Sequence, residues 1–281
     1  MSGKSRLIGL LISDITNPFS PELVRSIEKL ALHDGFEVIV TSTGYDPERM
    51  SQCVRRMLER KADGIAIITS KMEEGLVAQL EKRQIPIVFL DAGKIGRGIS
   101  NIEVDYGMGI REAVEHLFHL GHERIGFIRG SLELRSALTR RAAFMKWLQH
   151  YGFVSEEHII QTGSRKIDGG EAATEELLLV LARPTAVLNS NDLTAIGALR
   201  AIHKAKLRVP EDISVVGFDD IDMSELTQPA LITVRLSRTE LAEKALDALV
   251  ASISGKLQKG CEYHVDTDRI VRGSTAGRTT R

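Results

Sequence analysis

Short aliphatic runs recur along the chain, and amphipathic segments lie between them. The runs show almost no polar alternation, which is typical of parallel strands that helices cover on both faces. Strands that alternate with helices over short connections predict βαβ units and a parallel sheet. The expected strands are Leu7–Ile12, Glu37–Val40, Gly64–Ile68, Pro86–Leu90, Arg124–Ile128, Thr185–Leu188 and Ile213–Phe218.

Helix start signals support this alternation. Ser20-Pro21-Glu22 and Asp46-Pro47-Glu48 each combine a capping residue, a proline and an acid, as the first turn of a helix favours. The alternation falls into two blocks, residues 6 to about 120 and about 121 to 235, and each block has enough strands for its own sheet. The fold class is therefore predicted to be α/β, with two doubly wound parallel-sheet subdomains around a cleft.

Composition and charge narrow the range of functions. The 281 residues are 43% hydrophobic, which is enough for one large or two ordinary cores. Lysine and arginine (37) nearly balance aspartate and glutamate (38), whereas a domain that binds nucleic acid usually has a basic excess. Cys53 and Cys261 match no disulfide framework, and we see no signal peptide or membrane segment. We therefore expect a cytoplasmic protein that does not contact a membrane.

Polar side chains follow several of the expected strands. Ligands of open α/β sheets bind outside the carboxyl ends of the strands, and short carboxylates and carboxamides there suit a polyhydroxylated or heterocyclic solute. The same residue types are also common helix caps and turn formers, so each one alone has both interpretations. Their convergence on several strand ends favours a binding cleft. These residues are Asp14, Asn17, Asp91, Asn189 to Asp192, Asp219 and Asp220.

Patterns typical of catalysis or metal binding are missing from the sequence. We find no dinucleotide-binding glycine pattern, phosphate-binding loop, nucleophile elbow or nucleophile–base pair. His116, His119 and His122 are spaced by three, but a predicted helix ends among them, where histidine ordinarily complements the helix dipole. Trp147 and Tyr151 share one helix face, which we interpret as packing rather than sugar stacking. We expect no enzymatic activity, no metal and no cofactor.

Five segments, in this order along the chain, carry a resemblance to a known family. They are Ile8–Phe19, Glu115–Ile128, Asn191–Leu199, Val209–Asp220 and Arg272–Thr275. Together they resemble the effector-binding core of the lactose-repressor (LacI) type of bacterial transcription regulators, over nearly the whole chain. That core is similar in fold to type I periplasmic sugar-binding proteins, and the resemblance implies the same fold here.

The resemblance implies a discontinuous division of the chain and a homodimer. It divides the chain into an N-terminal subdomain of residues 6–120 plus 237–262, a C-terminal subdomain of 121–236 plus 263–277, a disordered start or vector remnant at 1–5, and a tail at 278–281. Three crossings between the subdomains would form a hinge.

The resemblance also assigns effector-binding residues, position by position. An arginine fork opposite aspartate and asparagine can hold adjacent hydroxyls or a purine edge through paired bonds. Asp192 is expected to cap its helix rather than contact ligand. Tyr106 and Leu236 depart from the family pattern and are expected to modify specificity toward a less hydroxylated effector; Ala143 is a further departure. The implied effector-binding residues are Asp14, Asn17, Phe19, Asp91, Arg140, Asn191 and Asp219.

The function implied by the resemblance is control of transcription. A small molecule, a sugar or related metabolite before a purine, would set the subdomain orientation and so control operator binding by an N-terminal helix-turn-helix. That module is not in this sequence, so we expect an excised core, with natural loss as the alternative, and operator DNA as a partner only of a full-length form. The alternative function is a solute-binding receptor for sugar uptake.

Overall fold

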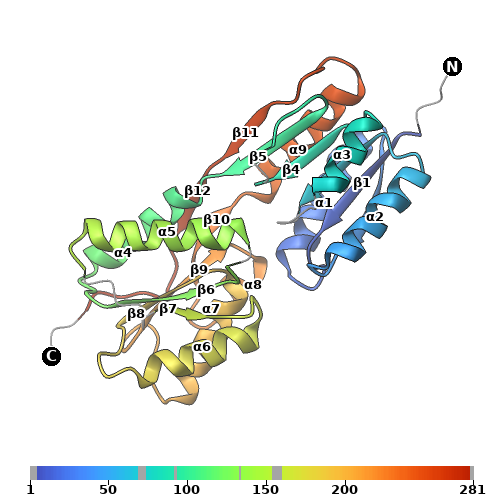
Figure 1. Cartoon of the computed structure of the whole chain (residues 1–281). Helices are drawn as coiled ribbons and strands as arrows, with labels where there is room; N and C mark the ends of the chain where they lie inside the picture. The colour runs from blue at the N-terminus through green and yellow to red at the C-terminus, as the bar shows by residue number, and fades with distance from the viewer. Residues whose placement is uncertain (1–4, 69–73, 92–93, 133, 154–159, 279–281) are drawn as a thin grey trace. The chain divides into compact units, whose positions relative to one another are not determined.

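The computed structural model (Figure 1) divides the chain into two compact units. Unit 1 comprises Met1–Val104 and Ser237–Val265, and unit 2 comprises Asp105–Leu236 and Asp266–Arg281. The chain therefore passes between the units three times. The structure describes residues 5–68, 74–91, 94–132, 134–153 and 160–278.

Of the two terminal segments expected from the sequence, 1–5 and 278–281, only Ser5 and Arg278 belong to the described residues. Arg278 is not part of a loose tail, because its backbone N–H donates to the Leu120 carbonyl and its side chain pairs with Glu123. Within the described ranges, no helix is both long enough and apolar enough to cross a membrane.

Unit 1 is a parallel sheet with helices on both faces. Its elements are β1 (Leu7–Ile12), α1 (Phe19–His33), β2 (Glu37–Ser42), α2 (Pro47–Glu59), β3 (Gly64–Ile68), α3 (Glu74–Lys82), β4 (Ile87–Leu90), β5 (Ile99–Val104), α9 (Arg238–Ile253) and β11 (Glu262–Val265). The strand order is β11-β5-β4-β3-β1-β2, and all five neighbouring pairs are parallel.

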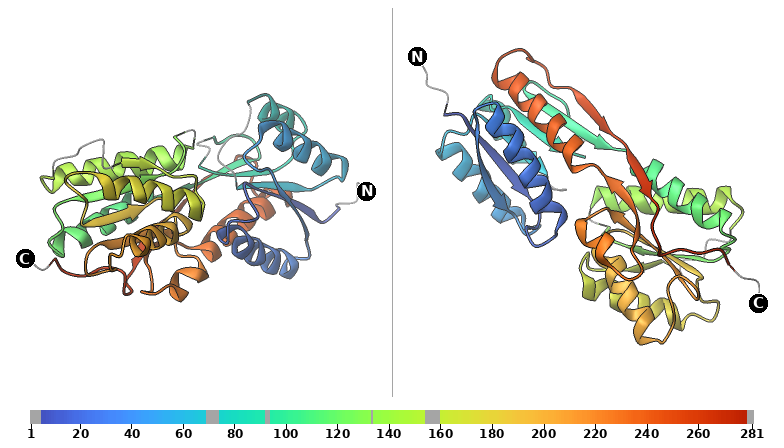
Figure 2. Two further views of the ribbon diagram at one scale, coloured as in Figure 1. Left: turned by 90° about the horizontal axis from the view of Figure 1, so that it is seen from below. Right: turned by 180° about the vertical axis from the view of Figure 1, so that it is seen from behind.

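The helices of unit 1 bury apolar stripes against the two faces of this sheet. Met57 of α2 and Leu80 of α3 pack into one core cluster with Ile65 and Phe89 of the strands. On the other face, α9 lies beside α1, as the blue and orange helices of Figure 2 show. Helix α9 and strand β11 thus belong to a segment that begins more than 130 residues after the rest of unit 1 ends at Val104.

Unit 2 repeats the architecture. Its elements are α4 (Tyr106–His119), β6 (Ile125–Arg129), α5 (Arg135–His150), β7 (Ile160–Thr162), α6 (Ile167–Leu179), β8 (Ala186–Asn189), α7 (Asp192–Lys204), β9 (Ser214–Asp219), α8 (Asp222–Leu226), β10 (Ile232–Leu236) and β12 (Thr267–Ile270). The strand order is β12-β10-β9-β8-β6-β7, in which only the β10–β12 pair is antiparallel.

Helices α6 and α7 cover one face of this second sheet, and α4 and α5 cover the other. On the first face, Leu177 and Ile202 pack with Val187 of the sheet. On the second, Phe144 of α5 stacks on Phe127 of β6, with ring centroids 4.7 Å apart. Helix α5 is therefore anchored directly above the strand that leads into it.

The structure differs from the sequence analysis in where the units divide and where α1 begins. Helix α4 packs on α5, β10 and β12, so the first crossing lies at Val104 rather than near residue 120, and β11 continues unit 1 to Val265. Helix α1 begins at Phe19, with Pro18 at its N-cap, so Ser20 is not the cap. The second expected cap is confirmed, because the Asp46 side chain accepts from the Glu48 and Arg49 N–H groups.

Candidate functional site

A buried arginine at the carboxyl ends of two strands is the most distinctive feature of unit 2. Arg140, on α5, is only 7% exposed. Its guanidinium carbon lies 3.9 Å from the Phe218 ring centroid and 4.5 Å from that of Tyr106. The two ring centroids are 5.9 Å apart, so the rings lie on adjacent sides of the cation and stabilise it electrostatically. Phe218 precedes Asp219 at the end of β9, so α5 positions the cation over that strand end.

The charge of Arg140 is balanced by a carboxylate, but loosely. Arg140 Nη2 lies 3.8 Å from Asp219 Oδ1, and both side chains are only 9% exposed. Arg140 Nη1 donates to the carbonyl of Ser190, which follows β8. A separation of 3.8 Å is an ion pair without a direct hydrogen bond, so the guanidinium keeps donor capacity for another acceptor.

Three buried polar atoms close to this pair have no hydrogen-bond partner among the described residues. They are Arg140 Nε, Ser190 Oγ and Asn189 Oδ1. Buried polar groups in folded proteins are almost always satisfied, so a group of orphans at one strand end calls for water or a ligand. The sequence analysis singled out this strand end but chose Asn191; Asn189 and Ser190 were missed because nothing local distinguishes the four polar residues in a row.

Asn191 and Asp192 have structural roles that the structure shows plainly. Asn191 is the N-cap of α7: its Oδ1 accepts from Thr194 N–H at 2.9 Å, and its Nδ2 donates to the Arg165 carbonyl. The prediction that Asp192 caps this helix is therefore wrong. The Asp192 carboxylate is instead fully buried and accepts from Ile221 N–H (2.9 Å), Ser224 Oγ (2.7 Å) and Thr233 Oγ1 (2.6 Å).

This carboxylate fixes the segment that follows Asp219. Burial, together with the nearby Asp219 charge, raises the pKa of Asp192 to about 7, although three donors oppose the shift. A second pair supports the same segment, because Arg272 Nη2 lies 2.8 Å from Asp220 Oδ1. The segment after β9 is thus fixed by the hydrogen bonds to Asp192 and by the ion pair between Arg272 and Asp220.

Positive φ angles occur at three residues of the predicted strand ends, and at six other non-glycine residues of the described ranges. Asp91, Asp219 and Asp220 have φ of 55°, 110° and 57°, a region that residues other than glycine rarely adopt. Such conformations cost about 1–3 kcal/mol each and cluster at ligand-binding sites. In Asp91, the carboxylate also accepts from Val104 N–H at 3.0 Å, which ties the end of β4 to the end of β5.

The other predicted residues of unit 1 lie in the turn after β1. Asp14 Oδ1 accepts from the Thr16 N–H and hydroxyl at 2.9 and 2.7 Å. Asn17 Oδ1 accepts from Phe19 N–H at 3.1 Å, at the start of α1. Arg238, which pairs with Glu22 at 2.7 Å, also lies 5.9 Å from the Phe19 ring centroid. All three predicted residues are partly exposed at the carboxyl end of β1.

The two residues named as specificity modifiers have different settings. Tyr106 is buried and forms one of the two aromatic walls around Arg140. Leu236 is also buried, at the end of β10, where its backbone pairs with Thr267 of β12. Tyr106 is therefore part of the arginine site, whereas nothing in the structure gives Leu236 a direct contact with Arg140.

The spaced histidines are tied to separate partners. His116 Nε2 lies 2.8 Å from Thr275 Oγ1, and burial beside Arg269 lowers its pKa to about 4. His122 Nδ1 lies 2.9 Å from Thr185 Oγ1, and burial lowers its pKa as well. His116 thus joins the carboxyl-terminal segment to α4, and His122 joins the loop after α4 to Thr185 and to the Ala276 carbonyl.

A different trio on the edge of unit 1 brings possible metal ligands together. Glu103, Glu262 and His264 each place a ligand atom within 4.8 Å of the others. His264 Nδ1 lies 3.8 Å from Glu103 Oε2, and its Nε2 lies 3.9 Å from Glu262 Oε1. These groups are largely open to water, where such charges ordinarily form weak ion pairs.

Comparison with known proteins agrees with this architecture. Residues 114–275, more than half of the chain, match the family described as the periplasmic binding protein-like domain. The chain belongs to that family. The repressor PurR of Aliivibrio salmonicida is 28% identical over 271 residues, which cover 96% of this chain and 81% of the relative. The ribose operon repressor of Escherichia coli strain K12 is 29% identical over 252 residues, covering 89% of this chain and 76% of the relative.

Solved structures give the same result. The dimeric Lac repressor with an 11-residue C-terminal deletion superimposes with a TM-score of 0.87 at 28% identity, covering 97% of this chain and all of that one. A LacI-family regulator from Enterococcus faecium with bound ribose also has a TM-score of 0.87, at 29% identity and the same coverage. The predicted type I fold and the prediction of a LacI-type effector-binding core are confirmed.

Proposed function

We propose that this core binds a small polar metabolite, a sugar or a related compound, and that the bound effector controls operator binding by a DNA-binding module. The observation that carries the proposal is the buried Arg140, which contacts two aromatic rings and lies beside Asp219 and three unsatisfied polar atoms. Such a set offers fixed donors and acceptors in a dry setting, where they discriminate strongly between ligands.

The proposed effector contacts comprise one set of residues in each unit. In unit 2, Arg140 and Asp219 are the main contacts, and Asn191 is retained only as a candidate because its amide already caps α7. Strained backbone at Asp91 and Asp219 supports a ligand-binding role at the strand ends. The contacts proposed for unit 1 are Asp14, Asn17, Phe19 and Asp91.

Two similar proteins, one solved with its ligand and one solved as a dimer, support a more specific proposal. The Enterococcus faecium regulator was solved with ribose, and the Lac repressor structure is of a dimer. We infer a sugar-class effector and a homodimer for this chain, and no catalytic turnover of the ligand. Exposed apolar side chains on α8, Met223 and Leu226, give unit 2 apolar surface for a partner subunit.

The test is a thermal-shift screen of this chain with pentoses, hexoses, sugar phosphates, polyols and nucleosides. A ligand at about a hundred times its Kd adds about 2.7 kcal/mol of stability, which for a protein of this size is a shift of a few degrees. Light scattering of the same sample gives the oligomeric state. A dimer that responds to a sugar supports the regulator, whereas a monomer that responds favours the solute receptor.

Two substitutions locate the site. Arg140→Met removes the fork and Asp219→Asn removes its counter-charge with almost no change in shape, and both should abolish the shift. Lys256→Met, on an exposed position of unit 1, should leave it unchanged. If both site variants fold and keep the shift, the effector binds elsewhere and the assignment to Arg140 is wrong.

A further inference from the structure

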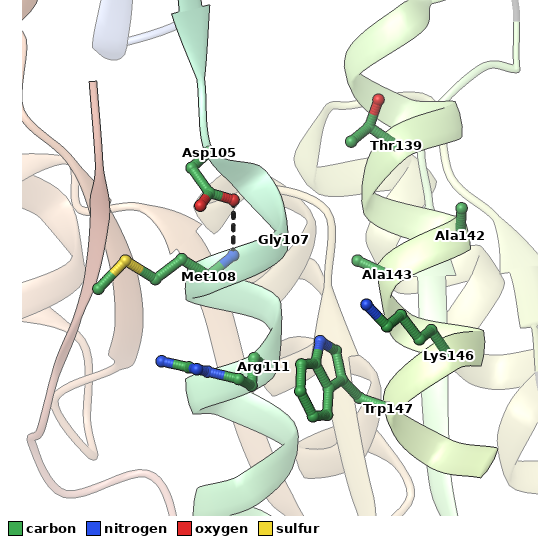
Figure 3. Close-up of a pocket in the computed structure, with 9 residues that line it drawn as sticks. All are labelled: Asp105, Gly107, Met108, Arg111, Thr139, Ala142, Ala143, Lys146 and Trp147. Carbon is green, nitrogen blue, oxygen red and sulfur yellow. Dashed lines mark hydrogen bonds between the residues drawn. The ribbon is translucent and has the colours of Figure 1, made fainter. Parts of the chain in front are cut away.

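A second, separate hollow lies on the helical face of unit 2. It is a groove of about 490 Å³ between α4 and α5, a size in the range of metabolite-binding sites (Figure 3). Small residues, Ala142 and Ala143 of α5, leave the space open, and Met108 of α4 and Trp147 of α5 give it apolar sides. The residues that line it are distinct from Arg140 and Asp219.

Two cations from the two helices flank the same indole. The guanidinium carbon of Arg111 lies 5.9 Å from the Trp147 ring centroid, and Lys146 Nζ lies 5.4 Å from it. Figure 3 shows Arg111 extending from α4 and Lys146 from α5, with Trp147 between them. The indole thus holds both charges at the groove through cation–π attraction.

These two charges lack counter-ions within the described part of the chain. Neither Arg111 nor Lys146 has a carboxylate within 4 Å, and Arg111 Nε is shielded from water without any hydrogen-bond partner. Asp105, which also lines the groove, accepts from Met108 N–H at 2.9 Å, and Glu115 hydrogen-bonds with Tyr151. Arg111 is partly buried with unused donors, which favours an anion as its partner, and the exposed Lys146 adds a second positive charge at the groove.

We propose that this groove binds an organic anion. Arg111 and Lys146 receive its phosphate or carboxylate, and its apolar body lies against Met108, Ala143 and Trp147. An arginine can hold two anionic oxygens in one plane, and a lysine adds a mobile point charge, so the pair fits either anionic group. The groove would then be a second ligand site on α5, the helix that also carries Arg140.

The chain offers a direct probe, because Trp147 is its only tryptophan. We would titrate the full chain with phenyl phosphate, benzoate and inorganic phosphate, and follow tryptophan fluorescence, with titration calorimetry as the second measurement. Saturable binding of phenyl phosphate or benzoate is expected, with inorganic phosphate at least tenfold weaker. Arg111→Gln and Lys146→Gln should each weaken the aromatic anion at least tenfold, and Lys256→Gln, at an exposed site of unit 1, should not.

The Arg140→Met variant separates this groove from the proposed effector site. Aromatic anions should bind it with unchanged affinity, even where it no longer responds to any sugar. Three results would each overturn the proposal. They are loss of anion binding in Arg140→Met, wild-type affinity for the aromatic anion in Arg111→Gln and Lys146→Gln, and no saturable binding to the wild-type chain up to about 10 mM. Inorganic phosphate that binds as tightly as phenyl phosphate would overturn the role given to the apolar sides.

Discussion

Substitution of Asp192 tests quantitatively how the segment that follows Asp219 is stabilised. Its carboxylate is fully buried and accepts three hydrogen bonds, from Ile221 N–H, Ser224 Oγ and Thr233 Oγ1. Asp192→Ala leaves these three donors without an acceptor, at about 1–3 kcal/mol each, and the two hydroxyls can recover part of this by rotating. We expect a loss of about 3–5 kcal/mol in the free energy of unfolding.

Asp192→Asn removes the ionisable group but keeps nearly the same side-chain shape, so it isolates the effect of the charge on stability. The amide keeps one oxygen acceptor and mimics the protonated acid, but its NH₂ group faces a donor, so we expect a loss of about 1–2 kcal/mol at pH 5. The pKa of Asp192 is raised to about 7 in the fold from 3.8. Between those values the folded state binds a proton that the unfolded state has released, so the stability contributed by the acid falls as pH rises.

The size of this pH effect follows from the same pKa. Each pH unit inside the window changes the stability by at most about 1.4 kcal/mol. From pH 5 to pH 7 the advantage of the wild-type chain over Asp192→Asn should therefore shrink by about 2 kcal/mol. All other titrating groups are common to the two chains and cancel in the difference.

Urea unfolding, followed by far-ultraviolet circular dichroism at pH 5, 6 and 7, measures both effects. Asp168→Asn is the matched control, because this aspartate side chain is 94% exposed and its substitution should change stability by under about 0.5 kcal/mol at every pH. A wild-type advantage over Asp192→Asn that stays constant from pH 5 to 7 would refute the assignment of a raised pKa. An Asp192→Ala chain as stable as the wild type would refute the role of the carboxylate altogether.

Three further predictions concern two residues of unit 2 and one of unit 1. Burial beside Arg269 lowers the pKa of His116 to about 4, so the folded state resists protonation of this histidine and loses stability as pH falls below 6.5. His116→Gln should therefore reduce the stability lost between pH 6.5 and 4.5 by about 2 kcal/mol, as measured by urea unfolding. A Cβ on Gly197 would overlap the backbone of α6 at the Ile167 carbonyl, so Gly197→Ala should cost about 1–3 kcal/mol. Gly75→Ala, on open surface in α3, should instead be neutral or stabilising by up to about 1 kcal/mol in the same assay.

The sequence predicted the strands with a continuous aliphatic run, together with β2 at the edge of its sheet, but not β5, β7, β10, β11 and β12. Ile8, Leu10 and Leu11 of β1 are fully buried between two helical layers, so their whole strand is aliphatic and stands out. Strand β11 reads Glu-Tyr-His-Val and lies at the edge of its sheet, where one side has no neighbour. Because β11 carries polar side chains at this edge, it lacks the continuous apolar run on which the prediction depended.

The division of roles among neighbouring polar residues also depends on distant contacts. Asn191 and Asp192 are adjacent and chemically similar, and either could cap α7. What decides between them is Thr233, 41 residues further on, whose hydroxyl lies 2.6 Å from Asp192 Oδ1. That partner cannot be inferred from a local pattern, so the sequence identified the strand end as polar but named Asp192 instead of Asn191 as the helix cap.

The two rings beside Arg140 leave part of its guanidinium uncovered. The Tyr106 and Phe218 ring centroids lie 4.5 and 3.9 Å from the guanidinium carbon but only 5.9 Å from each other, so the rings lie on adjacent sides of the cation and do not enclose both of its faces. Nη1 already donates to the Ser190 carbonyl, which leaves donors at Nε and Nη2 in the plane of the group. An effector bound there, as we propose, would pair with these donors through in-plane acceptors, such as two adjacent hydroxyl oxygens at the edge of the fork. Because the buried Tyr106 ring adds an apolar surface beside the arginine, an effector with an apolar face, less hydroxylated than a common hexose, stays the prediction for this position.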